Sequence, residues 1–440
     1  MKIAIIGTGY VGLTTGTCFA EVGHEVICVD NNPEKVEILE NGQIPIYEPG
    51  LEELVKKNVA AGRLSFTTDT PASVEAAEVI MIAVPTPPQP DGSVDLTFIE
   101  KVAREIAESL KPEFDHKVIV DKSTVPVKTG EKVGETIRRY APEGVKFGVC
   151  SNPEFLREGS AVDDLLNPDR IVIGANDRDS KSIMRRVYDP FHAPVLVTDI
   201  ESAELIKHAA NSFLALKISY INAVAAVCEA SGADIELVAQ GIGMDDRIGK
   251  RFLNAGLGYG GSCFPKDIKA FIAISESIGS PFPLLKEVER INDDMRARFL
   301  SKIREKLWVL RDKKIAVWGL AFKQNTDDVR ESVAIKLIHD MVGEGAEVVA
   351  TDPQALETAQ KFGNFNDKVT ITDDMYEALE GAEALVIATE WPEFANADLE
   401  KVKAKLRTPL IFDGRNLMDP DNMKAFGFEY HSVGRPSVEG

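Results

Sequence analysis

The chain has 440 residues, of which 44% are hydrophobic and 27% are charged. At roughly 100 to 200 residues per domain, this composition is typical of a folded, multidomain protein and excludes an intrinsically disordered chain. Fifty basic and seventy acidic side chains give a formal net charge of −20. We therefore expect neither nucleic acid nor a membrane surface as a partner. No run of 18 uncharged apolar residues occurs, so no membrane-spanning segment is expected.

The cysteines and histidines show no pattern of a disulfide framework or a metal site. The five cysteines form an odd, scattered set without a CxxC pair, and the six histidines lack metal-ligand spacing. We expect no zinc knuckle and no bound metal, and the cysteine usage favours a reducing cytoplasm.

The first third of the chain alternates predicted strands and helices. Residues 1–32 read as a strand, a glycine-rich turn, a helix and a second strand. Apolar runs at 79–84, 117–121, 147–150 and 171–174 predict further strands, with helical segments such as 96–110 between them. This alternation predicts an α/β fold with a parallel, doubly wound sheet, a Rossmann-like domain.

The plan of the first third returns after a helical middle. Residues 202–231 form an apolar-periodic stretch that predicts a long helix, which could connect domains, form a dimer seam or simply belong to a core. From Lys313 onward, KKIAVWG matches KIAIIG and EVVATDP matches EVICVDNNP. We therefore expect two Rossmann-like domains, 1–200 and 301–440, joined by a central helical and dimerisation region, 201–300.

The turn after the first strand carries the sequence GTGYVG and predicts a dinucleotide site. Gly7 permits a tight turn, Gly9 lets the backbone approach a pyrophosphate, and Gly12 allows close helix–strand packing. Asp30 ends the second strand, where a carboxylate can accept hydrogen bonds from the adenosine ribose but would repel a 2′-phosphate. The pattern therefore predicts NAD rather than NADP as the cofactor. The alternative interpretation of the three glycines is an ordinary turn. Two more strand ends, 84–87 and 123–126, fall where open sheets bind ligands.

The segment GYGGSCFPKD, residues 258–267, predicts an activated cysteine. Pro265 suits the first turn of a helix, so Cys263 is expected at a helix N-terminus. The helix dipole and Lys266 would lower the pKa of its thiol, and the preceding glycines leave room for a substrate. The other four cysteines are interpreted as buried apolar side chains. A nucleophilic thiol with a dinucleotide site indicates aldehyde oxidation through a thiohemiacetal and a thioester.

Eight motifs, in order along nearly the whole chain, resemble those of the NAD-dependent nucleotide-sugar dehydrogenases. They are GTGYVG, VPTP, STVP, NPEFLREG, the Lys207/Asn211 pair, GYGGSCFPKD, LAFKQNTDDVRES and FDGRN. The resemblance implies a four-electron oxidation of a sugar C6 hydroxyl to a carboxylate, with two NAD and one water. It implies UDP-glucose as substrate, and Tyr259 and Phe264 resemble the glucose branch; GDP-mannose or a UDP-N-acetylhexosamine is the alternative. A non-catalytic NAD or sugar-nucleotide sensor is the alternative from another class.

The resemblance also implies catalytic roles. Cys263 is the covalent nucleophile, and Lys207 and Asn211, four residues apart on one helical face, stabilise oxyanions. The proton transfers and the water are assigned to Glu154, Thr124 and Asp267. Without the resemblance, Lys207 reads as a solvated helix lysine and Glu154 as a surface carboxylate.

Cofactor and substrate residues follow from the same resemblance. The second half replaces the glycine fingerprint with Gly319-Leu320-Ala321-Phe322-Lys323, which suits a different phosphate ligand, UDP. Arg247 resembles an arginine supplied by a neighbouring subunit, which implies a homodimer; a surface arginine is the alternative. The implied NAD residues are Gly7, Gly9, Tyr10, Val11, Gly12, Asp30, Lys35, Pro85, Thr86, Ser123, Thr124, Glu154, Lys266 and Arg330. The implied substrate residues are Phe155, Leu156, Arg157, Lys207, Asn211, Arg247, Phe252, Leu253, Asn254, Gly258, Tyr259, Gly260, Phe322, Lys323 and Arg415.

Overall fold

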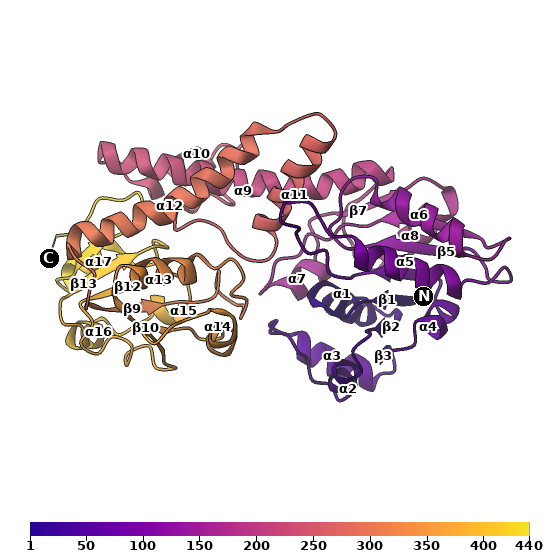
Figure 1. Ribbon diagram of the computed structural model, residues 1–440, viewed down its shortest axis with the longest axis horizontal. Coiled ribbons are helices and arrows are strands. Elements are labelled where there is room, and N and C mark those ends of the chain that lie inside the picture. The colour runs from indigo at the N-terminus through magenta and orange to yellow at the C-terminus, as the bar shows by residue number, and fades with distance from the viewer. Residues whose placement is uncertain (440) are drawn as a thin grey trace. The chain divides into compact units, whose positions relative to one another are not determined.

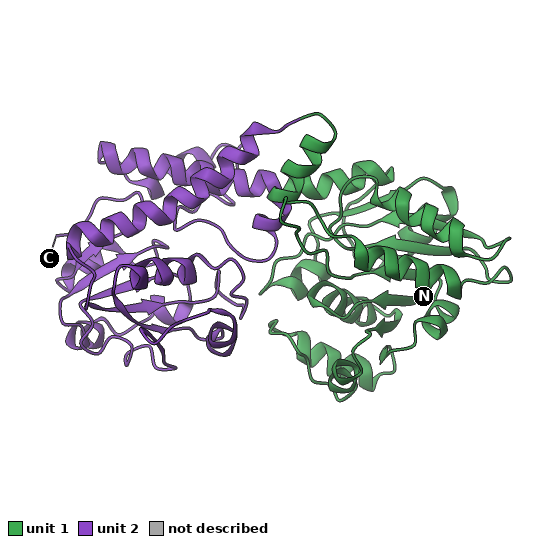
Figure 2. Cartoon of the chain, viewed as in Figure 1, with its two compact units in different colours: residues 1–210, 269–280 green, residues 211–268, 281–440 purple. Residues whose placement is uncertain are grey.

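The computed structural model describes residues 1–439 and divides the chain into two compact units (Figures 1 and 2). The first unit comprises residues 1–210 and 269–280, and the second comprises residues 211–268 and those from 281 onward. Two helices, α9 (Ile200–Ser231) and α11 (Phe264–Ser277), each have residues in both units. The long helix expected at 202–231 is confirmed as α9.

The first unit is built on an eight-stranded sheet with the order β3-β2-β1-β4-β5-β6-β7-β8. Neighbouring strands are parallel except β6 and β7, which pair antiparallel and depart from the expected all-parallel sheet. The order reverses between β1 and β4, the kind of switch point where such sheets bind ligands. The strands are β1 (Lys2–Ile6), β2 (Glu25–Val29), β3 (Leu64–Thr67), β4 (Val79–Ile82), β5 (Lys117–Asp121), β6 (Phe147–Ser151), β7 (Ile171–Ala175) and β8 (Val195–Thr198).

Helices cover both faces of this sheet, because side chains of a strand alternate between its faces. Ile3 and Ile5 of β1 belong to one buried cluster, with side chains of α1 and α8. Ala4 and Ile6 belong to the other, with side chains of α5 and α6. The helices are α1 (Tyr10–Glu21), α2 (Pro33–Glu40), α3 (Leu51–Ala60), α4 (Thr70–Ala76), α5 (Thr97–Ser109), α6 (Thr129–Tyr140), α7 (Ala161–Leu166) and α8 (Arg178–Tyr188).

The second unit has a six-stranded, all-parallel sheet with the order β11-β10-β9-β12-β13-β14. This order repeats that of the first six strands of the other sheet, which confirms two Rossmann-like folds. The strands are β9 (Lys314–Trp318), β10 (Glu347–Thr351), β11 (Val369–Ile371), β12 (Ala384–Ile387), β13 (Leu410–Asp413) and β14 (Glu429–His431). The helices are α10 (Ile235–Gly243), α12 (Pro283–Leu307), α13 (Val333–Gly343), α14 (Leu356–Phe362), α15 (Pro392–Ala395), α16 (Leu399–Lys405) and α17 (Pro420–Ala425).

One core joins the helices and the sheet of the second unit. Ile221 of α9 and Phe299 of α12 are buried in the same cluster as Trp318 of β9. Trp318 also stacks on Phe394, with 5.1 Å between ring centroids. The sheet and the preceding helices of this unit therefore share one hydrophobic core.

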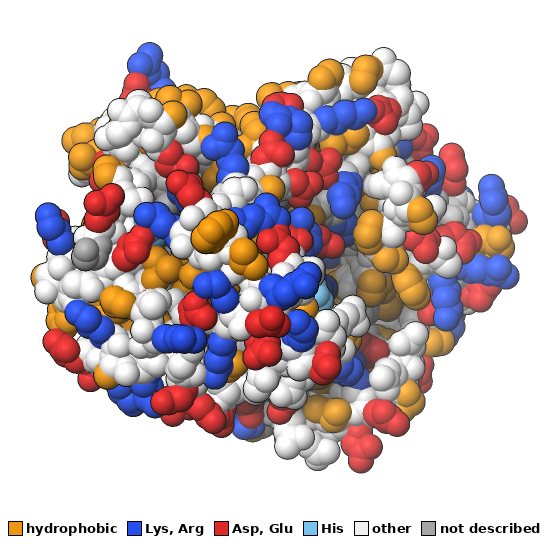
Figure 3. All heavy atoms as spheres, turned by 60° about the vertical axis from the view of Figure 1, so that its left-hand side comes forward, with side chains coloured by type: hydrophobic (Ala, Val, Ile, Leu, Met, Phe, Trp, Pro, Cys, Tyr) orange, Lys and Arg blue, Asp and Glu red, His pale blue; other side chains and the backbone are white. Residues whose placement is uncertain are grey.

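Helix α9 is the one helix within residues 1–439 that is long and apolar enough, by length and composition alone, to cross a membrane. Core helices of soluble proteins meet the same criterion, so this is weak evidence. Acidic and basic side chains are interspersed over the face of the molecule shown in Figure 3.

Candidate active site

The glycine turn after β1 is built for close approach of a ligand. Gly7 has φ +104°, and a Cβ there would lie 2.3 Å from the carbonyl oxygen of Ala83. A Cβ at Gly12 would lie 1.9 Å from the oxygen of Gly7, whereas one at Gly9 would meet nothing within 4 Å. The turn is therefore closed where it packs and open at the N-terminus of α1, where backbone N–H groups can bind a pyrophosphate.

Asp30 lies directly after β2 and faces this turn. Its Oδ2 accepts hydrogen bonds from the Thr8 N–H (3.1 Å) and the Thr8 hydroxyl (2.5 Å), and pairs with Lys35 Nζ at 3.0 Å. Partial burial raises the pKa of the Asp30 carboxyl, but these hydrogen bonds and Lys35 outweigh it and hold the pKa below its usual value. Asp30 is thus an ionised acceptor at the place where the sequence predicts the ribose.

Glu48 ties the glycine turn to the loop after β6, and sequence reasoning missed it. Its carboxylate is buried and accepts the N–H groups of Gly159 (2.7 Å) and Ala161 (2.6 Å). The hydroxyl of Tyr10, a predicted cofactor residue, also donates to Glu48. No local motif marks Glu48, because its partners are more than a hundred residues away in sequence or on another element.

Lys207 and Glu154 form a buried ion pair. Lys207 Nζ lies 3.1 Å from Glu154 Oε1 and donates to the Glu154 backbone oxygen at 2.7 Å, and both side chains are 5% exposed. Glu154 Oε2 accepts the Leu156 N–H at 2.6 Å. Burial of both groups excludes the alternatives of a solvated helix lysine and a surface carboxylate.

Helix α9 also holds the loop after β5. Glu204 accepts the N–H groups of Lys128 (2.6 Å) and Gly130 (2.7 Å) at the start of α6, and a ring nitrogen of His208 lies 2.8 Å from the Val125 oxygen. Burial raises the pKa of Glu204 to about 7. Glu204, Lys207 and His208 are three and four residues apart and therefore lie on one face of α9. This face holds the loops that carry Thr124 and Glu154.

A second polar cluster lies in the second unit at the start of α11. The Asn211 amide donates to Asp267 Oδ2 at 2.6 Å, and Lys266 Nζ lies 2.9 Å from Asp267 Oδ1. Asp267 is buried, whereas Cys263 is exposed and immediately precedes the helix. The expected place of Cys263 at a helix N-terminus is confirmed. Asn211 itself follows Lys207 by one turn of α9.

Arg415 gathers three predicted substrate segments. Its guanidinium donates to the backbone oxygens of Ala388 (2.8 Å), Gly258 (3.2 Å) and Phe322 (3.2 Å). Gly260 packs there as well, since a Cβ on it would lie 2.4 Å from the Glu331 oxygen. The structure thus brings the GYGG segment, the turn after β9 and the end of β12 together in the second unit.

Other predicted residues lie apart or use local partners. Arg247, Arg330 and Arg157 form ion pairs with carboxylates in their own segments, Asp245, Asp328 and Asp164. In the first unit, Val11 lies in the first turn of α1, Pro85 and Thr86 follow β4, Ser123 follows β5, and Phe155 follows β6. The remaining predicted residues lie in the second unit: Phe252, Leu253, Asn254, Tyr259 and Lys323. The sequence also missed Arg170, whose guanidinium lies 3.8 Å from the Phe155 ring centroid.

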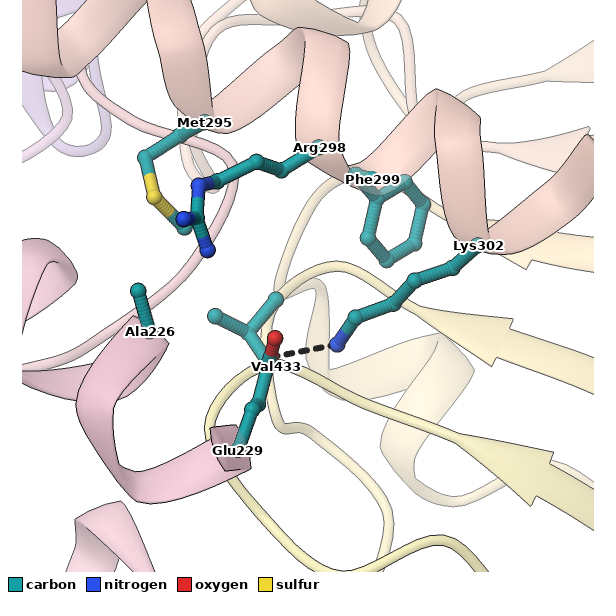
Figure 4. Close-up of a pocket in the computed structure, with 7 residues that line it drawn as sticks. All are labelled: Ala226, Glu229, Met295, Arg298, Phe299, Lys302 and Val433. Atoms are coloured by element: carbon teal, nitrogen blue, oxygen red, sulfur yellow. Dashed lines mark hydrogen bonds and ion pairs between the residues drawn. The ribbon is translucent and has the colours of Figure 1, made fainter. Parts of the chain in front are cut away.

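A small cavity in the second unit is lined by none of the predicted site residues (Figure 4). It has a volume of about 10 Å³, room for about one water. Its lining consists of Ala226, Glu229, Met295, Arg298, Phe299, Lys302 and Val433.

Family models match three consecutive parts of the chain. Residues 1–192 match the NAD binding domain of the UDP-glucose/GDP-mannose dehydrogenase family, residues 201–294 its central domain, and residues 316–420 its UDP binding domain.

Similar proteins cover the full length. A UDP-glucose 6-dehydrogenase of Bacillus subtilis is 48% identical over 439 residues, covering 100% of this chain and 94% of that protein. One of Rhizobium meliloti is 46% identical over 443 residues, with 99% and 100% covered. The solved structure of a UDP-glucose dehydrogenase from Pyrobaculum islandicum matches with a TM-score of 0.92 and 41% identity, covering 99% of this chain and 98% of that one.

Proposed function

Because this chain belongs to the UDP-glucose/GDP-mannose dehydrogenase family, whose members use NAD, we propose that it oxidises UDP-glucose to UDP-glucuronate. The names of the full-length relatives support this substrate over GDP-mannose and the UDP-N-acetylhexosamines. The observation that carries the proposal is the exposed Cys263 at the start of α11, in a chain whose other four cysteines are buried.

Cys263 takes part in the second half of the reaction. The first oxidation removes a hydride from C6 and a proton from its hydroxyl, which leaves an aldehyde. The Cys263 thiolate adds to the aldehyde carbon and forms a thiohemiacetal. Loss of a second hydride from carbon and of the proton from the thiohemiacetal hydroxyl gives a thioester. Water hydrolyses the thioester to the carboxylate and the thiol, with release of one proton. NAD, when bound, supplies the acceptor for each hydride.

The glycine turn and Asp30 would hold NAD. The open space at Gly9 fits the pyrophosphate, and the Asp30 carboxylate fits the ribose hydroxyls. The strand ends of the same sheet supply the remaining cofactor residues: Pro85, Thr86, Ser123 and Thr124 after β4 and β5, and Glu154 after β6.

The polar residues on and near α9 stabilise negative charge and transfer protons. Lys207 and Asn211 stabilise the negative oxygen that develops in each step, because an ammonium and an amide N–H are both donors. Glu154, Thr124 and Asp267 transfer protons and orient the hydrolytic water. Lys323 and Arg415, with the segments that Arg415 gathers, bind the UDP-sugar.

The decisive experiment counts NADH formed per UDP-glucose consumed, with limiting sugar nucleotide and excess NAD. Two NADH per sugar are expected from the intact chain, and Cys263→Ala should form no acid. One NADH per sugar in the intact chain, or acid formation by Cys263→Ala, would contradict the covalent mechanism. Turnover only of GDP-mannose or a UDP-N-acetylhexosamine would replace the proposed substrate.

We also propose that the chain acts as a homodimer through α9 and α10. Phe213, Tyr220 and Val227 are spaced by seven residues on α9, as are Leu237 and Met244 at α10, and these residues are 55% to 70% exposed. Seven-residue spacing aligns apolar side chains on one helical face, which another helix can cover. Arg247 follows α10 with its side chain 89% exposed, which supports its assignment to the site of the partner subunit.

Subunit mixing tests the dimer and Arg247 together. Arg247→Ala and Cys263→Ala homodimers should both be inactive, but a mixed dimer would hold one site with both residues intact. Exchange of subunits between the two variants should therefore restore up to about a quarter of the intact activity. No recovery, with exchange shown by mass spectrometry, would place Arg247 in its own subunit's site or outside any site. A monomer in sedimentation would contradict the dimer.

The domain limits and the compartment also remain proposals. The division into residues 1–200, 201–300 and 301–440 is supported by the return of the strand order after the helical region. A cytoplasmic location is supported by the scattered cysteines.

A further inference from the structure

Asn292 of α12 binds both backbone groups of Tyr259, and no motif assigns it to the reaction. Its Oδ1 accepts the Tyr259 N–H at 2.8 Å, and its Nδ2 donates to the Tyr259 oxygen at 3.1 Å. A side-chain amide carries an acceptor and a donor side by side, as a peptide group does. Two such hydrogen bonds fix the orientation of the Tyr259 backbone as well as its position, which a single hydrogen bond would not.

Gly258 leaves the space that this side chain fills. Its φ is +106°, and a Cβ there would lie 2.6 Å from Asn292 Oδ1. Glycine adopts this conformation without strain and allows the close approach. The sequence predicts that the glycines before Cys263 leave room for a substrate. At Gly258 the room is taken by Asn292, so the two residues belong to one structural feature.

The side chain of Tyr259 links its backbone to the residue next to Cys263. Its ring contacts Phe264 edge-on, with 5.8 Å between ring centroids and an interplanar angle of 87°. Phe264 is the first residue of α11 and directly follows Cys263. The Tyr259 hydroxyl is buried and has no hydrogen-bond partner within residues 1–439. The place of the ring is therefore set by packing and by the backbone that Asn292 binds.

Cys263 is also joined to Tyr259 by a short stretch of chain. Three residues separate the two in sequence. The Cys263 oxygen accepts the Asp267 N–H at 2.8 Å, so Cys263 lies at the N-cap of α11. A displacement of Tyr259 is thus passed on to the thiol by two routes, through the chain and through the Phe264 ring.

We propose that Asn292 is a positioning residue that places Cys263 for its addition to the aldehyde carbon, by holding the backbone of Tyr259. In that step the thiolate sulfur forms a bond to the carbon, and the carbonyl oxygen takes the electron pair and then a proton from water. A misplacement of about 1 Å between reacting groups can cost about 100-fold in rate. The reaction part of this inference rests on the proposed function.

The test separates the two half-reactions with the aldehyde form of the sugar nucleotide. The aldehyde with NADH runs the first oxidation backward and uses no thiol, whereas the aldehyde with NAD requires Cys263. Both rates are measured at saturating substrate, so that weaker binding does not enter. Asn292→Leu should slow aldehyde oxidation about 30-fold more than aldehyde reduction. Asn292→Asp keeps the acceptor for the Tyr259 N–H but loses the donor, and it should give an intermediate ratio.

The matched control is Ser219, which binds α12 one turn before Asn292. Its hydroxyl is buried on α9 and donates to the Val288 oxygen at 2.8 Å. Ser219→Ala therefore removes a buried hydrogen bond to the same helix and leaves the bonds to Tyr259 in place. It should slow both half-reactions equally or not at all. If Asn292→Leu fails to fold, Asn292→Ser, whose side chain is too short to bind both backbone groups, gives the same comparison.

A second measurement is made on the resting protein, without turnover. Iodoacetamide modifies the thiolate of Cys263, and a helix N-terminus favours the thiolate over the thiol. Asn292→Leu should lower the rate constant of this alkylation about threefold, because the thiol is no longer held at the N-terminus of α11. Ser219→Ala should leave the rate constant unchanged. Mass spectrometry of the digested protein identifies Cys263 as the modified residue.

The outcomes separate this inference from the proposed function. An unchanged alkylation rate in Asn292→Leu overturns the role of Asn292, whatever the substrate. Equal losses in the two half-reactions, or the same preferential loss in Ser219→Ala, also overturn it, because they show a general disturbance of α12. Slower alkylation in a chain that oxidises neither UDP-glucose nor its aldehyde would uphold the placement of Cys263 by Asn292 and overturn the proposed function alone.

Discussion

The two Rossmann-like units use the same turn and the same acidic position in opposite ways. Gly7 and Gly319 have φ of +104° and +106°, and an aspartate lies just after the next strand in each unit, Asp30 and Asp352. Asp30 Oδ2 accepts one backbone N–H from its turn, and Asp352 Oδ2 accepts two, from Leu320 (2.8 Å) and Ala321 (3.0 Å).

The difference lies in what remains available on each carboxylate. Asp352 is 2% exposed, accepts the Trp391 indole N–H on Oδ2, and accepts the N–H groups of Gln354 and Ala355 on Oδ1. Asp30 has a side chain that is 12% exposed, and one of its partners is Lys35, whose side chain is 24% exposed. The Asp352 carboxylate is therefore fully engaged inside its unit, whereas the Asp30 carboxylate keeps hydrogen-bonding capacity for the ribose that the sequence predicts there.

The largest expected effect is on Asp352. Asp352→Ala removes the acceptor of five hydrogen bonds, four of them buried, and should lower the free energy of unfolding of the second unit by about 4 kcal/mol. All three tryptophans, Trp308, Trp318 and Trp391, lie in this unit, so denaturant unfolding followed by tryptophan fluorescence reports on it selectively. Asp30→Ala should leave that transition in place. A loss below about 1 kcal/mol in Asp352→Ala would contradict the bracing role.

The second expected effect is on the pH dependence of stability. It concerns the helix that follows the fifth strand in each sheet order, which is α6 after β5 and α17 after β13. The start of α6 is held by the buried Glu204 from α9, whereas α17 is capped by its own exposed Asp419. The pKa of Glu204 is raised from 4.5 to about 7 in the folded chain. The folded chain therefore binds more protons than the unfolded one between those values, and its stability falls as pH rises through this window.

Glu204→Gln tests that sign. Gln does not titrate, so the stability of the intact chain should fall by about 3 kcal/mol relative to Glu204→Gln between pH 4.5 and 7, at about 1.4 kcal/mol per pH unit. Denaturant unfolding followed by circular dichroism at several pH values measures the difference, and Asp419→Asn is the matched control. A constant difference across the range would show that Glu204 does not titrate there.

The third effect is on cofactor choice. Asp30→Ala removes the acceptor expected to bind the ribose, which should raise the KM for NAD about 30-fold, equivalent to about 2 kcal/mol. The penalty against NADP should relax as well, because the negative charge that opposes a 2′-phosphate is gone. Initial rates with each cofactor measure both. An unchanged preference would make Asp30 a brace like Asp352 and remove the contrast between the two units.

The smallest expected effect is the loss of stability when one of the five hydrogen bonds to Asp352 is removed. Trp391→Phe removes one of five donors to Asp352 and should cost about 1 kcal/mol, because the other four remain. Fluorescence of the two remaining tryptophans measures the change. In an Asp352→Ala background the same substitution should cost less than it does alone, since the hydrogen bond is already lost.

Central strands could be predicted from the sequence, and edge strands could not. β1, β4, β5, β9 and β12 are buried on both faces, so their side chains form continuous apolar runs. β3, β8, β11 and β14 lie at the edges of the two sheets, and they are short with mixed burial. The antiparallel pairing of β6 with β7 was also missed, because a run of apolar residues does not encode strand direction.

The site divides in a similar way. Residues in local motifs, such as the glycines of the first turn and Cys263 before α11, could be placed because their partners are sequence neighbours. Glu48 and Glu204 could not, since the backbone N–H groups that they accept come from distant segments. The sequence alone does not distinguish a buried charged side chain from a surface one, because the residues that cover it come from other segments.

The exposure of a single cysteine allows the chain to be labelled at one site. Burial raises the pKa of Cys18, Cys28 and Cys150 to about 12, and Cys228 is buried as well. Because the reactive species of a thiol is the thiolate, an alkylating reagent should modify the native chain once, at Cys263, and the denatured chain five times. A fluorophore or spin label could thus be placed at that one position without first removing any other cysteine.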